Sequence, residues 1–250
     1  MLRSFFEFMF GVHYLKKLYE KNYHLPQLKE NFWGTTLQLF NIKYKFHNNT
    51  NLPKYGPSII VCNHPFGIVD GLIIANEVHA IRKDFKILIN EELTAVDHIK
   101  NYLLPLQFDN TKESIKNNII SKNKAIEFIN QGGCVIIFPS GEVATREHIL
   151  KKAVEKEWKS LLGSIVRKTK CSIYPVKFDG ENSFLFQLIG IINYKARRIM
   201  FAKELINKKN KMFWTKCGLP IPSEEYSKLD NPTISSRLRS VTLSINQQLY

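Results

Sequence analysis

The chain contains 250 residues, of which 44% are hydrophobic and 23% are charged, and its 36 Lys and Arg residues exceed its 22 Asp and Glu residues by 14. This apolar fraction excludes a disordered chain, and the length allows one sizeable core. No apolar run approaches the roughly 20 residues that span a bilayer, so we exclude a polytopic membrane protein.

The first part of the chain, residues 1–40, is expected to be a helical segment that precedes a main domain at residues 41–250. Large apolar residues recur there at helical spacing and form one face: Leu2, Phe5, Phe6, Met9 and Val12. Lysines follow at Lys16, Lys17 and Lys21, so the segment resembles an interfacial membrane anchor. A helix packed on the domain explains the same pattern equally well.

Beyond residue 40, short apolar strands alternate with helices. Strands are expected at about 42–46, 58–62, 85–89, 104–108, 134–138, 172–178 and 211–217. Helices are expected at about 27–40, 70–81, 92–104, 111–130, 155–168, 184–191, 196–206 and from 232 onward. This alternation predicts an α/β fold with a largely parallel central sheet flanked by helices, preceded by the amphipathic helical segment.

The basic excess indicates an anionic partner. An anionic membrane surface fits it, and so does a simple bias towards lysine on solvated faces. Nucleic acid is not expected, because neither an RNP-like aromatic motif nor zinc-finger spacing is present.

The cysteines and the N-terminus bear on localisation. The four cysteines lie far apart, which disfavours a metal site or a disulfide framework: Cys62, Cys134, Cys171 and Cys217. Free thiols fit a reducing cytoplasm. Glu7 interrupts the first apolar stretch, so we do not expect a cleaved signal peptide. We expect a cytoplasmic protein bound peripherally to the inner face of the cytoplasmic membrane, without a transmembrane span.

Two loops that follow buried strands carry the candidate chemistry, because loops at the carboxyl ends of parallel strands form ligand sites. The first loop contains His64, and Asp70 begins the helix after it. A carboxylate that orients an imidazole lets the other ring nitrogen take a proton from a substrate hydroxyl. A satisfied structural histidine is the alternative. Ser140 in the second loop is the nearest candidate nucleophile, but it lacks a GxSxG context, which favours direct attack by the substrate hydroxyl.

Together the two loops resemble the lysophospholipid acyltransferase family, which includes glycerol-3-phosphate and 1-acylglycerol-phosphate acyltransferases. Residues 64–71 match an HPxGxxDG box and residues 138–142 match an FPxGE box, as in the hemolysin-like or ornithine-lipid-type branch. Further similarity lies around Trp158 and at residues 174–176, 180–183 and 218–222. The resemblance covers about residues 40–230.

This resemblance implies an O-acyltransferase that moves a fatty acyl group from acyl carrier protein or coenzyme A to a lysolipid hydroxyl. His64 would be the general base and Asp70 its partner, and the backbone N–H groups near Gly141 would stabilise the oxyanion. No metal or redox cofactor is implied. The remaining candidate substrate-binding residues are Asn63, Phe138, Pro139, Ser140, Glu142 and Arg146.

The chain also departs from the family pattern. Five residues rather than four separate His64 from Asp70, and Val143 stands where the family carries an Arg for the acceptor phosphate. Arg146 could replace that Arg only if the loop bends back. We therefore expect an amino-acid-containing lysolipid, whose ammonium could pair with Glu142, although a turn-stabilising role for Glu142 is also open. The alternatives are an enzyme that makes phosphatidic acid, a non-catalytic basic membrane-binding protein, and a hydrolase.

Overall fold

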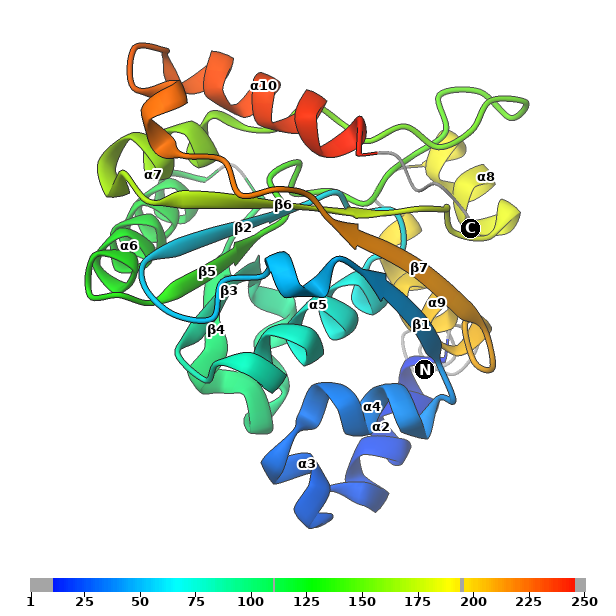
Figure 1. Cartoon of the computed structure of the whole chain (residues 1–250). Coiled ribbons are helices and arrows are strands. Elements are labelled where there is room, and N and C mark those ends of the chain that lie inside the picture. The colour runs from blue at the N-terminus through cyan, green and yellow to red at the C-terminus, as the bar shows by residue number, and fades with distance from the viewer. Residues whose placement is uncertain (1–10, 110, 194–195, 246–250) are drawn as a thin grey trace.

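The computed structural model describes residues 11–109, 111–193 and 196–245 (Figure 1). Its centre is a seven-stranded sheet in the order β1-β7-β6-β2-β5-β3-β4. The strands are β1 (Lys43–His47), β2 (Ser58–Cys62), β3 (Phe85–Asn90), β4 (Leu103–Leu106), β5 (Cys134–Ile137), β6 (Ser172–Phe178) and β7 (Met212–Cys217).

The predicted largely parallel sheet is confirmed. β6, β2, β5, β3 and β4 pair in parallel, as expected for strands joined by helical crossovers. β7 pairs antiparallel with β6, and β1 pairs parallel with β7, so the last two strands on this side of the sheet run against the others.

Helices cover both faces of the sheet (Figure 1). They are α2 (Val12–Asn22), α3 (Pro26–Glu30), α4 (Phe32–Leu39), α5 (Ile68–Ile81), α6 (Lys112–Asn130), α7 (Ser160–Thr169), α8 (Phe184–Ile192), α9 (Phe201–Asn207) and α10 (Asn231–Leu243). Short 3-10 helices occur at Asn49–Asn51, Glu91–Ala95, Asp97–Tyr102, Ala196–Met200 and Ser223–Tyr226.

The buried strands divide the core into two layers, because successive side chains point to opposite faces. In β2, Ile60 and Cys62 pack with α4 and α5, whereas Ile59 and Val61 pack with α6, α7 and α10. This two-faced burial explains why the central strands are continuous apolar runs.

The N-terminal segment is helical where it is described, but Asn31 divides the expected helix 27–40 into α3 and α4. Its side chain caps α4 by accepting the N–H of Gly34 at 3.0 Å. Trp33 and Leu37 are buried in the core of the main domain. The proposed apolar face from Leu2 to Met9 lies outside the described residues, and Val12 is 40% exposed. Among the described residues, no helix is both long and apolar enough to cross a bilayer.

Two further predicted helices differ from the structure. The region predicted as a helix at 92–104 instead forms two 3-10 helices and the start of β4. The helix predicted at 155–168 begins only at Ser160, because residues 155–159 form an extended segment that contributes two buried side chains to the site described below.

The amino edge of the sheet is closed by Arg82, whose side chain is almost fully buried. Its guanidinium donates to the carbonyl oxygens of Gly56 and Gly132, each at 2.9 Å, and to the carboxylate of Asp84. The turns before β2 and β5 are thereby tied together, and the carboxyl edge is left for the loops that carry the candidate chemistry.

Close packing of α7 on α10 gives a test of the fold. A Cβ at Gly163 would lie 2.1 Å from the carbonyl oxygen of Asn231, whereas a Cβ at Gly71 would meet no atom within 4 Å. We expect Gly163→Ala to lower the free energy of unfolding by about 2 kcal/mol or more, because the helices must separate. Gly71→Ala should raise it by up to about 1 kcal/mol. Equal effects of the two substitutions in chemical denaturation would contradict this packing.

Candidate active site

Parallel pairing of β2 with β5 brings the two predicted loops together. Val61 lies opposite Ile137 in the register, so the residues that follow each strand meet at the carboxyl edge. The rings of His64 and Phe138 lie 4.3 Å apart between centroids. Phe138 therefore packs against the imidazole and limits its movement.

His64 and Asp70 form the predicted pair. His64 Nδ1 lies 3.1 Å from Asp70 Oδ2, which also accepts the N–H groups of Phe66 at 2.8 Å and Gly67 at 3.0 Å. Gly67 precedes α5 with a φ of 78°, which favours glycine, and the five intervening residues fold into a turn that closes on the carboxylate. The longer spacing therefore does not prevent the contact. The His64 side chain is 19% exposed and that of Asp70 is fully buried, so solvent reaches the pair only through the imidazole.

Burial raises the pKa of Asp70, while the hydrogen bonds from His64, Phe66 and Gly67 act in the opposite direction. Among the described residues, no donor reaches Asp70 Oδ1, which is also buried. All the donors to this carboxylate therefore converge on Oδ2, the oxygen beside the imidazole. That convergence fixes the direction from which the carboxylate meets His64 Nδ1.

Glu155 is a buried carboxylate that the sequence analysis missed. Its Oε2 accepts the backbone N–H of His64 at 3.0 Å, and its Oε1 accepts the indole N–H of Trp158 at 3.0 Å. Burial raises the pKa of Glu155, and the His64 N–H opposes that rise. Two features of the sequence point to Glu155: it lies three residues before Trp158, and the family resemblance extends around Trp158. We place Glu155 as a positioning residue, because it contacts the backbone of His64 and not its ring.

Asn63 does not line the site as predicted. Its side chain is buried, and it donates to the carbonyl oxygen of Phe178 at 2.9 Å and accepts the N–H of Phe178 at 2.7 Å. The amide thus pairs with the backbone at the end of β6 as a neighbouring strand would. Asn63 fixes the start of the first loop.

The second loop is a tight turn. Gly141 has a φ of 68° and donates its N–H to the carbonyl oxygen of Phe138 at 3.0 Å, so this N–H is not available to the predicted oxyanion. Pro139 is buried, and its carbonyl oxygen accepts the N–H of Lys159 at 3.0 Å. Ser140 is 1% exposed and donates its hydroxyl to the carbonyl oxygen of Glu142 at 2.8 Å. Ser140 therefore stabilises the turn and is not presented as a nucleophile.

Glu142 lies on an open pocket of about 420 Å³ lined by Ser140, Glu142, Lys156, Glu157 and Lys159. Within the described part of the chain, its carboxylate makes no hydrogen bond or ion pair. The turn-stabilising alternative for this carboxylate is therefore not supported, because Ser140 performs that role.

The guanidinium of Arg146 is already engaged by other groups of the chain. Its guanidinium forms a two-point ion pair with Glu181 and donates to the carbonyl oxygen of Ile149 at 3.0 Å. The guanidinium lowers the pKa of Glu181. The backbone just before Arg146 does return to His64, because the N–H of Ala144 donates to the carbonyl oxygen of His64 at 2.9 Å. The guanidinium, however, is paired with Glu181, so in this structure it is not presented as a replacement for the phosphate-binding Arg.

A second buried polar cluster packs against Phe66, a residue of the first loop. Lys208 pairs with Glu204 at 2.9 Å, donates to Asn182 and lies 5.6 Å from the centre of the Phe66 ring. Gly180 is required beside it, because a Cβ there would lie 2.3 Å from Phe66. The residues 180–183 noted in the sequence are thus the supports of this cluster and of Arg146.

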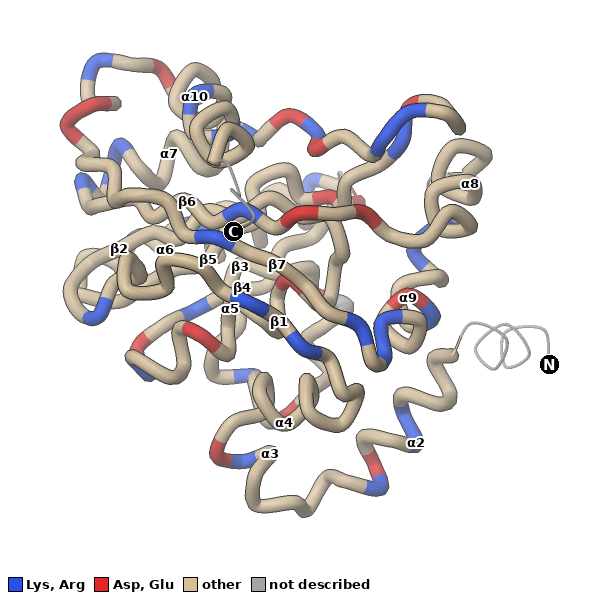
Figure 2. The backbone as a smooth tube through the Cα atoms, turned by 45° about the vertical axis from the view of Figure 1, so that its right-hand side comes forward, with Lys and Arg blue, Asp and Glu red and all other residues tan. Residues whose placement is uncertain are grey.

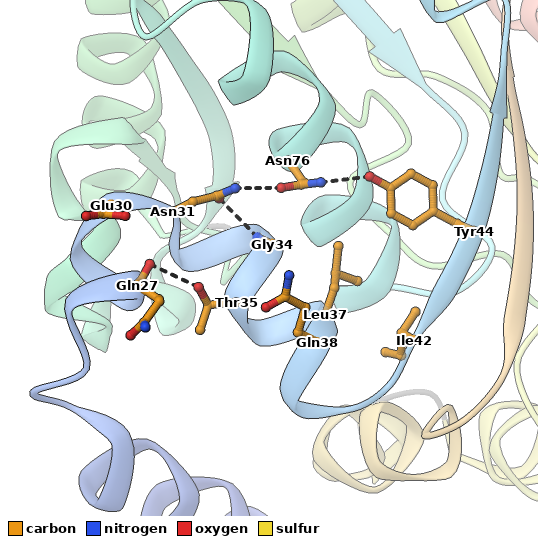
Figure 3. Close-up of a pocket in the computed structure, with 10 residues that line it drawn as sticks. All are labelled: Gln27, Glu30, Asn31, Gly34, Thr35, Leu37, Gln38, Ile42, Tyr44 and Asn76. Atoms are coloured by element: carbon orange, nitrogen blue, oxygen red, sulfur yellow. Dashed lines mark hydrogen bonds between the residues drawn. The ribbon is translucent and has the colours of Figure 1, made fainter.

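The pocket shown in Figure 3 lies between α3, α4, α5 and β1 and has a volume of about 370 Å³. It contains none of the residues of the two loops. Its polar side chains bind one another, with Asn31 donating to Asn76 at 2.8 Å and Asn76 donating to Tyr44 at 2.7 Å. We interpret it as a structural junction.

The matched range of one family model includes both loops. A model described as Acyltransferase matches residues 43–179, which is more than half of the chain. The chain belongs to the lysophospholipid acyltransferase family. It is therefore an acyltransferase, and the His64–Asp70 pair lies within the family domain.

Two sequence relatives and one solved structure are consistent with this family. This acyltransferase is 24% identical to the lyso-glycine lipid O-acyltransferase of Phocaeicola vulgatus over 240 residues, which cover 89% of this chain and 82% of the relative. It is 25% identical to the enzyme of the same name from Bacteroides thetaiotaomicron, with coverage of 89% and 85%. The crystal structure of the 1-acyl-sn-glycerophosphate acyltransferase of Thermotoga maritima matches with a TM-score of 0.55 and 16% identity, covering 96% of this chain and 90% of that chain. At this identity the last match shows the fold.

Glu155→Gln tests the positioning role. An amide offers one acceptor oxygen where His64 and Trp158 present two N–H donors, so one donor loses its partner. We expect kcat/KM of the acyltransferase to fall about tenfold or more, mainly through kcat, while Glu127→Gln on an exposed face of α6 leaves it unchanged. Equal kinetics for both variants would contradict the role.

The same variant has a pH signature that a packing defect would not produce. Because burial raises the pKa of Glu155, folded protein holds this proton more tightly than unfolded protein. Its stability contribution is complete below the ordinary carboxyl pKa and is lost as pH rises through the raised value. Thermal melts should show wild type gaining stability relative to Glu155→Gln as pH falls towards 4.5.

Proposed function

We propose that this acyltransferase transfers a fatty acyl group from a thioester of acyl carrier protein or coenzyme A to the hydroxyl of an amino-acid-containing lysolipid. The observation that carries the proposal is the His64–Asp70 pair, with an Nδ1 to Oδ2 distance of 3.1 Å, at the carboxyl edge of the sheet. A hydroxyl needs a base to attack a thioester, and this pair is built to supply one.

In the proposed mechanism, His64 Nε2 removes the proton from the acceptor hydroxyl as its oxygen attacks the thioester carbonyl. Asp70 holds Nδ1 as the donor and stabilises the imidazolium that forms. The C–S bond then breaks, a C–O ester bond remains, and the thiolate leaving group takes the proton back from His64. These steps need neither a metal nor a redox cofactor, and we propose none.

Two observations support an amino-acid-containing acceptor. Two relatives that this chain matches over most of their length are named for lyso-glycine lipid, and the guanidinium of Arg146 is paired with Glu181 rather than presented to a phosphate. Bidentate Arg recognition is the usual means of holding a phosphate monoester. We therefore propose a glycine-linked lysolipid in membrane lipid biosynthesis before lysophosphatidic acid.

We also propose that the enzyme works at the inner face of the cytoplasmic membrane without crossing it. The net charge of +14 supports this placement, because anionic headgroups attract a basic surface. We propose that the N-terminal segment at residues 1–40 adds to the attraction, with the acyltransferase domain following at 41–250.

His64→Ala and Asp70→Asn test the mechanism. We expect His64→Ala to abolish acyl transfer, and Asp70→Asn to lower kcat by about 10³–10⁴, because Asn cannot accept from Nδ1 and the backbone donors as a carboxylate does. Acyl transfer from labelled thioester, with circular dichroism to show folding, measures both. Full activity of folded His64→Ala would overturn the base assignment.

The acceptor and the role of Glu142 are tested with a panel of lysolipids. It contains 3-hydroxyacyl amides of glycine and of ornithine, and lysophosphatidic acid. We expect the glycine compound to be preferred; preference for lysophosphatidic acid would establish the phosphatidic acid alternative instead.

If Glu142 pairs with an ammonium, Glu142→Gln should lower kcat/KM for the ornithine compound by about tenfold. Transfer to the glycine compound, which has no free ammonium, should stay the same. A uniform loss on both acceptors would contradict the pairing.

Thioester breakdown by wild type at the full rate without any acceptor would identify a hydrolase.

A further inference from the structure

The outer face of α8 is unusual because it is entirely apolar. Its exposed residues recur at helical spacing, and none of them can form a hydrogen bond through its side chain: Phe184, Leu185, Ile191 and Ile192. Leu188, one turn after Phe184, is half-buried. Ile192 is 76% exposed. The helix carries no charged residue, and its polar Gln187 faces inward and is buried.

The apolar face continues onto the neighbouring loop and 3-10 helix. Leu150 is 87% exposed in the loop after Arg146, and Ile149 before it is also exposed. Ile199 is exposed on the 3-10 helix Ala196–Met200, which contacts α8. Arg146 joins the loop to α8, because it donates to Ile149 and lies 5.9 Å from the centre of the Phe184 ring. We name the exposed residues of α8 together with Ile149, Leu150 and Ile199 the α8 surface.

Basic side chains border the α8 surface. Lys151 and Lys152 directly follow Leu150, and Arg198 precedes Ile199; all three are exposed, and Glu147 is the exposed acidic residue of the loop. Figure 2 shows Lys and Arg on the loop beside α8 and around α9. A convex apolar face with a basic border matches an anionic bilayer, whose acyl region takes up the apolar residues and whose headgroups attract the lysines.

The α8 surface is connected to the candidate active site through two hydrogen bonds. The carbonyl oxygen of His64 accepts the N–H of Ala144 at 2.9 Å, and the carbonyl oxygen of Ala144 accepts the Gln187 side chain of α8 at 3.3 Å. Gln187 also accepts the N–H of Arg146 at 3.0 Å. In Figure 1, α8 follows the carboxyl end of β6, at the edge of the sheet that carries His64.

We propose that the α8 surface inserts into the anionic bilayer and thereby places His64 at the level of the lipid headgroups. The inference rests on the proposed function in one respect, because it explains how a membrane-embedded acceptor reaches His64. It adds a membrane contact distinct from the N-terminal segment, formed by residues that are more than 100 positions later in the chain.

Site-specific labelling tests the insertion directly. All four native cysteines are buried, so a single new cysteine can be labelled with a polarity-sensitive fluorophore. We place it at Leu150→Cys or Ile192→Cys, with Tyr55→Cys as the control. Tyr55 is 85% exposed and precedes β2, at the amino edge of the sheet, so it matches Leu150 in exposure but lies at the opposite edge.

With vesicles of phosphatidylglycerol and phosphatidylethanolamine, we expect the emission of labels at 150 and 192 to shift to shorter wavelength, and that of the label at 55 to stay unchanged. The shift should weaken in phosphatidylcholine vesicles and at high salt. Equal shifts at all three positions, or none at 150 and 192 while the protein sediments with vesicles, would overturn the proposal. A shift with an acidic acyl carrier protein but not with vesicles would assign the surface to the donor instead.

Substitutions in the α8 surface and its basic border test how much each contributes to vesicle binding. Leu150→Asp combined with Ile192→Asp should lower binding to anionic vesicles at least about tenfold, whereas Tyr55→Asp should not. Lys151→Gln with Lys152→Gln should lower binding to anionic vesicles by about tenfold and leave binding to neutral vesicles unchanged. All substituted residues are exposed, so melting temperatures should stay close to that of wild type.

The experiments distinguish a failure of the membrane-surface proposal from a failure of the proposed function. If the labels insert but wild type transfers no acyl group to any acceptor, the membrane surface stands and the proposed function falls. If wild type transfers acyl groups and the aspartate variant keeps the same ratio of activity on vesicle-bound to monomeric short-chain acceptor, the α8 surface is not used. We expect that ratio to fall about tenfold.

Discussion

Everything at the candidate active site is arranged around one oxygen atom, Oδ2 of Asp70. It accepts the N–H groups of Phe66 and Gly67 and lies 3.1 Å from His64 Nδ1. The same atom therefore stabilises the turn before α5 and orients the imidazole. The arrangement is costly, because burial raises the pKa of Asp70 and Oδ1 lacks a donor among the described residues. Such a cost is typical of a functional group whose orientation is determined by its surroundings.

Those surroundings hold the first loop from several sides. Glu155 accepts the backbone N–H of His64, Asn63 pairs with the backbone of Phe178, and Lys208 supports Phe66 from behind. Each of these polar groups has its own partner, so the loop does not rely on the bound substrate for its shape. A base held in this way loses little conformational entropy during the reaction, which is the physical advantage of a preorganised site.

The sequence predicted the central strands, the parallel sheet and the His64–Asp70 pair well, because each is a local pattern: an apolar run, an alternation of elements, or a short box between a strand and a helix. It did not predict the reversal of β1 and β7, because no local pattern encodes strand direction. The helix expected at 155–168 begins only at Ser160, and a helical assignment of residues 155–159 gives no sign that Glu155 contacts His64. The engagement of Arg146 by Glu181 joins segments 35 residues apart, and only the fold brings them together.

The two edges of the sheet are used for opposite purposes. At the amino edge the buried guanidinium of Arg82 joins the turns before β2 and β5 through hydrogen bonds to Gly56 and Gly132. At the carboxyl edge the same two strands are followed by the loops of the site, which are hydrogen-bonded through Ala144 and Gln187 to α8. A diacyl product is too apolar to leave through water, so an acyltransferase benefits from an apolar surface next to its base. Strands β2 and β5 run from one edge to the other, so the turns joined by Arg82 and the loops beside the surface that would meet the lipid belong to the same hydrogen-bonded pair of strands.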